Sequence, residues 1–373
     1  MAFVHLRSHT EFSVVDGTVR IDDLVKAAAK DGQPAVAVTD LSNLFGAIKL
    51  YSSARKKGVQ PLIGADVWLE PDEPGRPVSR LLLLIQNRKG YLHLSELLGE
   101  AWTAPGMRTH ASVFWESLAQ RSEGLIALAG AEMGCVGQAL MNGDAGRAEA
   151  LARRLAAIFP GRFYIELQRA GLPTNEAHIR AAVPLAAKIG LPVVATHPIQ
   201  FSTPDDFEAH EARTCIAEGE TLGNPRRIKR FTREQYFKTQ AQMEALFADL
   251  PSAVANTVAI ARRCALTLVL GKPQLPDFPT PILQDGPDAG KPMPMADYFR
   301  QLSHEGLVER LEHLFPDEAK REAQRPRYVE RLDFEINTIL KMGFPGYFLI
   351  VADFINWAKN NGCPVGPGRG SGA

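Results

Sequence analysis

Cysteine and net charge are both scarce in this chain of 373 residues. Its four cysteines lie far apart and form no Cys-x-x-Cys pair, which excludes a zinc knuckle and a disulfide framework and favours a reducing compartment. The 42 basic and 42 acidic side chains cancel, so no overall field attracts the chain to nucleic acid or to a membrane. Any contact with DNA must therefore come from a local patch.

A leader and a membrane-spanning segment are also missing from the sequence. No basic stretch precedes an apolar run at the N-terminus, and no uncharged segment reaches about eighteen residues. We therefore expect a cytoplasmic protein that does not enter membranes. The chain does contain 45% hydrophobic residues, over a length that suits two or three domains, and this is enough for a sizeable core.

Short β-branched or leucine-rich runs alternate with helical patterns over the first half of the chain. Strands are predicted at residues 3–6, 35–39, 62–69, 80–85, 125–129, 163–167 and 192–196. Helices are predicted at residues 21–30, 44–57, 91–102, 144–159 and 175–189. This order predicts a mainly parallel sheet and favours a small closed barrel over an open doubly wound sheet. The interval between Leu69 and Arg80 is too short for a crossover helix, so the flanking strands should form a hairpin.

The pattern becomes helical beyond Phe201. Helices are predicted at residues 205–217, 240–264, 295–314, 318–342 and 346–360. Residues 271–294 are crowded with proline, glycine and aspartate and lack hydrophobic periodicity, which predicts a linker. The densest basic run is residues 226–230, followed by Arg233. Such a run can contact a nucleic-acid backbone, although a solvated loop face is its commoner meaning.

Polar residues at alternate positions mark the first predicted strand. His5, Arg7 and His9 should point to one face of a strand, and Asp16 follows them. Two imidazoles and a carboxylate in this arrangement can open a metal site. The alternative is a polar barrel mouth with hydrogen-bonded histidines.

The C-terminal residues 366–372 read Gly-Pro-Gly-Arg-Gly-Ser-Gly. Glycine lets backbone N–H groups approach an anion closely, and an arginine can hold two phosphate oxygens, so the run can form a polyphosphate cradle. A flexible glycine tail is the alternative, because no Gly-Lys-Ser/Thr of a P-loop is present.

Two sets of motifs resemble known families. Residues 343–351 (Gly-Phe-Pro-Gly-Tyr-Phe-Leu-Ile-Val) and 364–373 resemble the entry to the palm of the alpha subunits of bacterial DNA polymerase III, the C-family replicative polymerases. Residues 3–17, 35–46, 62–69 and 192–201 resemble the polymerase-and-histidinol-phosphatase (PHP) domain, a metal-binding (β/α)₇ barrel that begins such subunits. The resemblance implies an α/β chain with a PHP barrel and helical extension at 1–270, a linker at 271–294 and the first part of a palm domain at 295–373.

The metal ligands of active PHP domains occupy nine positions, and the resemblance allows each to be checked here. The family's ligand positions fall on Arg7, His9, Asp16, Leu41, Asp66, Arg80, Pro198 and Gln200, and the ligand expected near Ala129 or Gly130 is absent. Only His9, Asp16 and Asp66 retain a side chain that can coordinate a metal, while Arg7 and Arg80 add positive charge that repels one. We therefore expect a metal-free, inactive barrel in which Arg7 and Arg80 form ion pairs with Asp16 and Asp66. His197 is an alternative ligand, although a lone histidine at a strand end is more often structural.

The resemblance also implies a function. The complete alpha subunit is a DNA-directed DNA polymerase that uses Mg²⁺ held by palm aspartates, and those aspartates lie beyond Ala373, so this piece should not synthesise DNA. Arg369, Gly370 and Ser371 match the part of the motif that contacts the incoming deoxynucleoside triphosphate. Further implied partners are template-primer DNA, a sliding clamp bound through regions outside this chain, and a proofreading 3′–5′ exonuclease subunit docked on the barrel. The alternative function is a metal-dependent PHP-family phosphoesterase.

Overall fold

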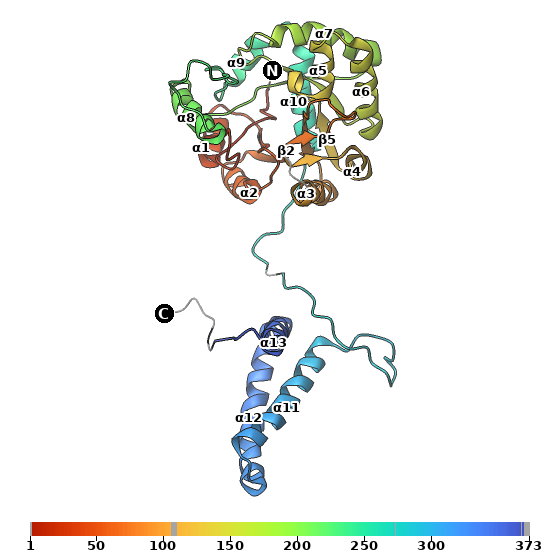
Figure 1. The fold of residues 1–373 in the computed structure, drawn as a ribbon, viewed down its shortest axis with the longest axis vertical. Helices are drawn as coiled ribbons and strands as arrows, with labels where there is room; N and C mark the ends of the chain where they lie inside the picture. The colour runs from red at the N-terminus through yellow and green to blue at the C-terminus, as the bar shows by residue number, and fades with distance from the viewer. Residues whose placement is uncertain (1, 106–109, 273, 367, 369–373) are drawn as a thin grey trace. The chain divides into compact units, whose positions relative to one another are not determined.

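The computed structural model describes residues 2–105, 110–272, 274–366 and 368, so the predicted triphosphate contacts at Arg369, Gly370 and Ser371 lie outside the described residues (Figure 1). The chain divides into two compact units, Met1–Leu268 and Val269–Ala373. The first unit is an α/β barrel and the second consists of helices.

Seven strands of the first unit form one curled sheet. They are β1 (Ala35–Val38), β2 (Gln60–Leu69), β3 (Ser79–Ile85), β4 (Ser112–Val113), β5 (Leu125–Leu128), β6 (Phe163–Gln168) and β7 (Val193–Thr196). The order is β1-β2-β3-β5-β6-β7, with β4 beside β2. Only β3 runs antiparallel to its neighbours, β2 and β5, and the predicted hairpin is therefore confirmed. The short strand β4 carries no clear sequence pattern and was not predicted.

The N-terminal segment connects the two ends of this sheet. His5 pairs with Val36 of β1, and Ser8 pairs with Ile199, three residues beyond β7. The backbone N–H of Ala37 donates to His5, and that of His9 donates to Ile199. The prediction of a regular strand at residues 3–6 is wrong, because the segment changes partner after a few residues and forms isolated bridges. Its contacts with both sheet edges nevertheless produce the predicted barrel.

Helices surround the strands of the first unit (Figure 1). They are α1 (Ile21–Lys30), α2 (Ala47–Lys56), α3 (Arg88–Thr103), α4 (Trp115–Gln120), α5 (Cys135–Met141), α6 (Ala145–Ile158), α7 (Asn175–Ile189), α8 (Phe207–Glu218), α9 (Gln240–Leu246) and α10 (Pro251–Arg263). The predicted single helix at residues 240–264 is wrong. Pro251 lacks an N–H group and begins a new helix, so α9 ends before it.

The barrel has two apolar layers because successive side chains of a strand alternate between its faces. Outward side chains such as Ile63, Leu83 and Ile165 pack under the helices, as do Leu24 and Ala28 of α1. Inward side chains such as Leu62, Leu84 and Leu128 pack with Ile260 and Cys264 of α10. The side chain of Gln60, at the start of β2, donates to the carbonyl groups of Ala261 and Cys264. Helix α10 therefore closes the barrel at the amino ends of its parallel strands.

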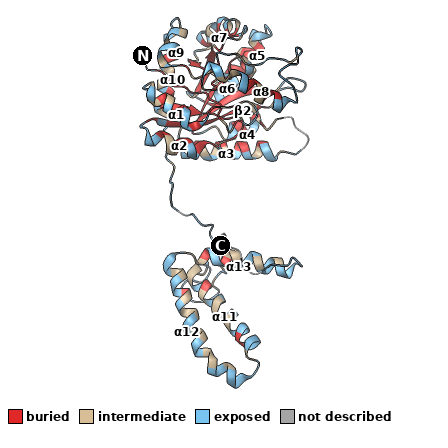
Figure 2. Cartoon of the chain, turned by 90° about the vertical axis from the view of Figure 1, so that its left-hand side faces the viewer, coloured by how far each residue is buried: buried red, intermediate tan, exposed pale blue. Residues whose placement is uncertain are grey.

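The second unit consists of α11 (Met295–Leu314), α12 (Glu318–Met342) and α13 (Pro345–Asn360), which confirms the three helices predicted there. Its small core contains Phe299, Ile336 and Leu349. Most of its residues are exposed or half-buried, in contrast to the barrel (Figure 2). Among the described residues no single helix is long and apolar enough to cross a membrane, and α12 and α13 pass that test only together, as a pair bent by 115°.

Candidate functional site

Charged side chains gather inside the barrel at the end opposite α10. Asp66 lies near the carboxyl end of β2, and Glu166 lies in the second half of β6. Arg80 lies at the start of β3, whose antiparallel direction brings its first residues to the same rim. The carboxyl ends of the strands are where barrels of parallel strands carry their functional groups. We call Arg7, His9, Asp16, Asp66, Arg80 and Glu166 the mouth cluster.

Arg7 is the centre of the mouth cluster. Its Nε donates to Oε1 of Glu166 at 2.8 Å and its Nη2 donates to Oε2 at 3.1 Å, which is the two-point geometry that fits a guanidinium to a carboxylate. Its Nη1 donates to Asp66. All three residues are buried. Burial lowers the pKa of Arg7, but Asp66 and Glu166 outweigh burial, so the pKa is raised and the guanidinium stays charged.

Asp66 receives three positively charged donors on one oxygen. Arg7, Arg80 and His9 all approach its Oδ2, at 3.2 Å in the case of His9 Nε2. Burial raises the pKa of Asp66, but the charges of Arg7 and Arg80 are the larger combined influence and hold the pKa far below its ordinary value. Arg80 is held from its other side by Trp68, whose ring centroid lies 4.5 Å from the guanidinium carbon.

His9 joins two carboxylates. Its Nδ1 lies 2.9 Å from Oδ1 of Asp16, while its Nε2 contacts Asp66. Burial alone would lower the pKa of His9, but Asp16 and Asp66 outweigh burial and raise the pKa to about 9. His9 is therefore protonated at neutral pH. The pKa of Asp16 is lowered, because the charge of His9 outweighs the effect of burial.

The mouth cluster is balanced in charge. Three cations, Arg7, Arg80 and protonated His9, face three carboxylates, those of Asp16, Asp66 and Glu166. An unpaired charge in a protein interior costs several kcal/mol, so such groups persist only when they are paired and hydrogen-bonded. The cluster therefore cross-links β2, β3, β6 and the N-terminal segment by charge-assisted hydrogen bonds.

Glu166 is the member of the cluster that the sequence did not reveal. Besides Arg7, its carboxylate accepts hydrogen bonds from the backbone N–H of Gly130 at 2.9 Å, from Gln168 at 2.9 Å and from Thr196 at 2.5 Å. The charge of Arg7, with the hydrogen bonds from Arg7, Thr196 and Gln168, outweighs burial and lowers the pKa of Glu166. The sequence could have indicated it only as the single acidic residue of the β6 segment Phe-Tyr-Ile-Glu-Leu-Gln, whose six residues are all buried in the structure. It does not coincide with any of the family's nine ligand positions.

The structure corrects two details of the site predicted from the sequence. The expected ion pairs of Arg7 and Arg80 form with Asp66, but Asp16 pairs with His9 instead of with an arginine. His5 does not share the face of Arg7 and His9, because residues 3–10 do not form a regular strand. Its Nε2 hydrogen-bonds the carbonyl of Lys238 at 2.7 Å.

The other family positions carry side chains that do not coordinate metals. Leu41 lies beside Asp66 through a backbone bridge and has an apolar side chain. Pro198 offers only its carbonyl, 3.5 Å from the side-chain nitrogen of Gln235. The amide nitrogen of Gln200 lies 3.4 Å from His9 Nδ1. His197 is fully buried, and neither ring nitrogen has a hydrogen-bond partner among the described residues.

The mouth cluster does not fit a catalytic metal centre. In the part of the chain that the structure describes, no three His, Cys, Asp or Glu side chains are arranged to hold a metal ion. A divalent cation near Asp66 would also meet Arg7, Arg80 and protonated His9, whose repulsion is weakly screened inside the barrel. The arrangement can bind the strands together, but it supplies no open coordination site.

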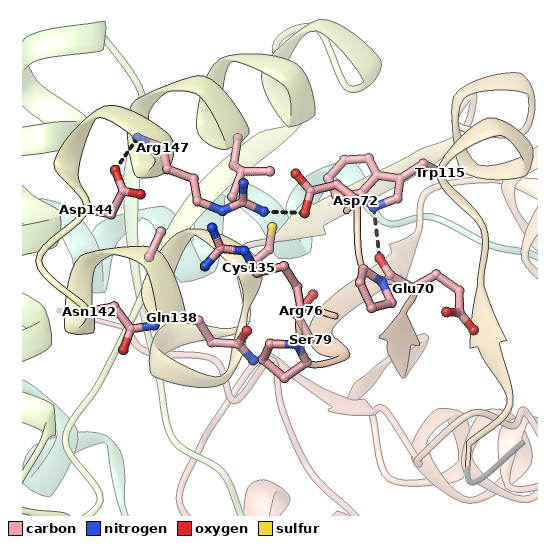
Figure 3. A pocket seen from close by; sticks show the side chains of 14 residues that line it. Glu70, Asp72, Arg76, Ser79, Trp115, Cys135, Gln138, Asn142, Asp144 and Arg147 are labelled. Atoms are coloured by element: carbon pink, nitrogen blue, oxygen red, sulfur yellow. Dashed lines mark hydrogen bonds and ion pairs between the residues drawn. The ribbon is translucent and has the colours of Figure 1, made fainter. Parts of the chain in front are cut away.

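A small depression lies outside the barrel, between the β2–β3 hairpin and helices α5 and α6 (Figure 3). Its volume of about 50 Å³ is room for one or two water molecules. Arg147 pairs with Asp72 there at 2.5 Å, and the indole N–H of Trp115 donates to the carbonyl of Glu70 at 2.9 Å. These contacts engage part of the polar lining, and the space is too small for a substrate.

The charge state of His9 predicts how the barrel responds to alkali. Because its pKa is raised from 6.5 to about 9, its contribution to stability is complete below pH 6.5 and is lost as the pH rises through 9. We expect the wild type to lose on the order of 2 kcal/mol of unfolding free energy from this source between neutral pH and pH 10. Urea unfolding of wild type and His9→Gln at both pH values measures it. A variant that loses as much stability as the wild type would contradict this assignment.

Comparison with known protein families finds one match within each of the two units. Residues 5–170 match the PHP domain family, and residues 297–373 match the family described as the bacterial DNA polymerase III alpha NTPase domain. Over 100% of its length the chain is 50% identical to the DNA polymerase III subunit alpha of Pseudomonas aeruginosa. The chain belongs to the DNA polymerase III alpha-subunit family.

Other relatives give the same result. The DNA polymerase III subunit alpha of Neisseria meningitidis serogroup A is 50% identical, and that of Escherichia coli K12 is 43% identical, each over 100% of this chain. The chain covers 31% of the Pseudomonas and Escherichia proteins and 32% of the Neisseria protein. It therefore spans about a third of the length of the DNA polymerase III alpha subunits that it matches.

Proposed function

We propose that the barrel of this chain is a metal-free, non-catalytic scaffold at the front of a replicative DNA polymerase, where it docks the proofreading 3′–5′ exonuclease subunit. The mouth cluster carries this proposal. Arg7 and Arg80 occupy family ligand positions and neutralise Asp66 and Glu166, the carboxylates that would otherwise attract a metal. A barrel stabilised by its own ion pairs can remain rigid without metal, which suits a docking platform.

The polymerase activity itself is proposed for the longer protein. Family membership supports DNA-directed DNA synthesis from deoxynucleoside triphosphates on a template-primer, with Mg²⁺ as cofactor and a sliding clamp bound elsewhere in the protein. Arg369, Gly370 and Ser371 are the proposed triphosphate contacts. The catalytic aspartates of the family motif have no counterpart within these 373 residues, so the chain alone should not extend a primer.

Metal content tests the proposed loss of the metal centre. The purified chain, incubated with Zn²⁺ or Mn²⁺ and then desalted, should retain no stoichiometric metal by inductively coupled plasma mass spectrometry. It should also show no metal-dependent hydrolysis of p-nitrophenyl phosphate. One or more equivalents of metal that disappear in Asp66→Ala would overturn the proposal and favour the phosphoesterase alternative.

Docking is tested separately by mixing the chain with the purified exonuclease subunit of the same organism. Size-exclusion chromatography should show a stable complex, and the chain should remain unable to extend a primer in the presence of Mg²⁺ and deoxynucleoside triphosphates. If the full-length alpha subunit binds the exonuclease and this chain does not, the docking surface lies outside these residues and this part of the proposal fails.

A further inference from the structure

A loop between α8 and α9 carries positive charge without any acid. Residues 224–233, here called the basic loop, contain Arg226, Arg227, Lys229, Arg230 and Arg233 and no aspartate or glutamate. The chain as a whole has no net charge, so this is a strong local departure. The mouth cluster and the function proposed for the barrel make no use of it.

Buried contacts hold the basic loop in place at both ends. Arg227 forms an ion pair with Glu211 of α8, and both side chains are about 95% buried or more, at 4% and 5% exposure. The hydroxyl of Thr232 donates to the carbonyl of Ala170, and the ring of Phe231 packs edge-on against His210 with 4.7 Å between centroids. Arg227 therefore acts as an anchor, and the remaining cations are presented from a fixed backbone.

The other cations of the basic loop face solvent. Arg226, Lys229, Arg230 and Arg233 are all exposed. Among the described residues, Arg226, Lys229 and Arg233 have no ion-pair partner, and Arg230 has only Glu218 at 3.4 Å, with 64% of the arginine side chain exposed. A surface pair of this kind contributes little and is readily exchanged for another anion. Ile228, between them, is 72% exposed and can form no side-chain hydrogen bond.

We propose that the basic loop binds the phosphodiester backbone of nucleic acid without reading its sequence. Exposed guanidinium groups match phosphate oxygens in two-point geometry, and the adjacent Lys229 adds a further charge. Contacts to phosphate oxygens carry no sequence information, so binding through them should be independent of base order. The choice of nucleic acid over an acidic protein segment rests on the proposed function, in which the protein acts on DNA.

Fluorescence anisotropy of the 373-residue chain with labelled oligonucleotides tests the inference. Probes that differ only in sequence should bind with similar affinity. Comparison of single-stranded with duplex probes measures which form of nucleic acid the chain prefers. Binding should weaken steeply between about 50 and 200 mM salt. Arg226→Glu/Lys229→Glu should weaken binding on the order of tenfold. The slope of the logarithm of the binding constant against the logarithm of the salt concentration should also become shallower, by about 0.7 for each single-strand phosphate that the loop no longer neutralises.

A matched control separates the loop from the total charge. Lys56→Glu/Lys57→Glu makes the same change in charge at two exposed residues at the end of α2 and should leave binding within about twofold of wild type. Circular dichroism melting verifies that both variants are folded.

Three outcomes would overturn the inference. In the first, neither probe binds at low salt. In the second, Arg226→Glu/Lys229→Glu and Lys56→Glu/Lys57→Glu lose equal amounts of DNA affinity. In the third, Arg226→Glu/Lys229→Glu no longer binds a labelled polyglutamate peptide but still binds DNA. Each outcome is compatible with a full-length protein that still extends primers, so failure here is distinguishable from failure of the proposed function.

Discussion

Replacing Glu166 with alanine should lower the free energy of unfolding of the barrel by about 3–5 kcal/mol. Arg7 would lose its two-point partner, and Gly130, Gln168 and Thr196 would lose the acceptor for their donors. The cluster would then hold three cations against two carboxylates in a buried setting. Removing one partner of a buried pair costs more than the pair itself contributes, because the charge that remains has no compensation.

Urea unfolding at neutral pH measures this effect, with Glu116→Ala as the matched control. Glu116 is exposed in the first turn of α4, so its loss should cost less than about 1 kcal/mol. The double variant Arg7→Met/Glu166→Leu should be more stable than Glu166→Ala, since it removes both charges and fills the space with apolar atoms. If Glu166→Ala is no more destabilising than the Glu116 control, the mouth cluster does not stabilise the barrel as described.

The sequence predicted most of the barrel because its strands are short apolar runs with clear ends. Six of the seven predicted strands are present, and α1 and α7 begin and end where they were expected. The failures have local physical causes. The N-terminal segment obtains its hydrogen bonds from two different edges, and a proline divides the helical pattern near Pro251. Neither event changes hydrophobic periodicity, which is the property that the prediction used.

The mouth cluster was predictable only as far as the family positions reached. Those positions identified Arg7, Arg80 and Asp66, and the opposite charges indicated an ion pair. Glu166 lies 100 positions beyond Asp66 in the sequence, and only the closing of the sheet brings both to Arg7. Asp16 pairs with His9 because the chain turns after residue 10 and brings the two side chains together. The sequence pattern did not reveal this turn.

A second group of histidines should make the barrel sensitive to acid. His5 and His197 are fully buried, with 6.3 Å between their ring centroids. Burial lowers the pKa of His5 from 6.5 to about 4 and that of His197 from 6.5 to about 3, and the positive charge of Lys238 also lowers both values. The backbone near Glu234 and Tyr236 acts to raise the pKa of His197, but burial outweighs it. Both rings are therefore neutral in the folded protein at physiological pH.

The sign of the effect follows from these lowered pKa values. The unfolded chain binds protons at His5 and His197 near pH 6.5, while the folded barrel resists them until about pH 4 and pH 3. Stability contributed by the neutral rings is thus complete above pH 6.5 and is lost as the pH falls below that value. Between pH 6.5 and about 4.5 the loss should be on the order of 2 kcal/mol for each histidine.

Replacing His197 with leucine should remove its share of this acid sensitivity. Leucine has a similar volume and no nitrogen to protonate, and neither nitrogen of His197 has a hydrogen-bond partner to lose among the described residues. Urea unfolding is measured at neutral pH and at about pH 4.5. Between these values the free energy of unfolding of His197→Leu should fall less than that of the wild type, by on the order of 2 kcal/mol. His93→Phe, at a half-buried position on α3, is the control and should follow the wild-type pH dependence. A His197→Leu variant that loses stability in parallel with wild type would show that acid acts on the barrel elsewhere.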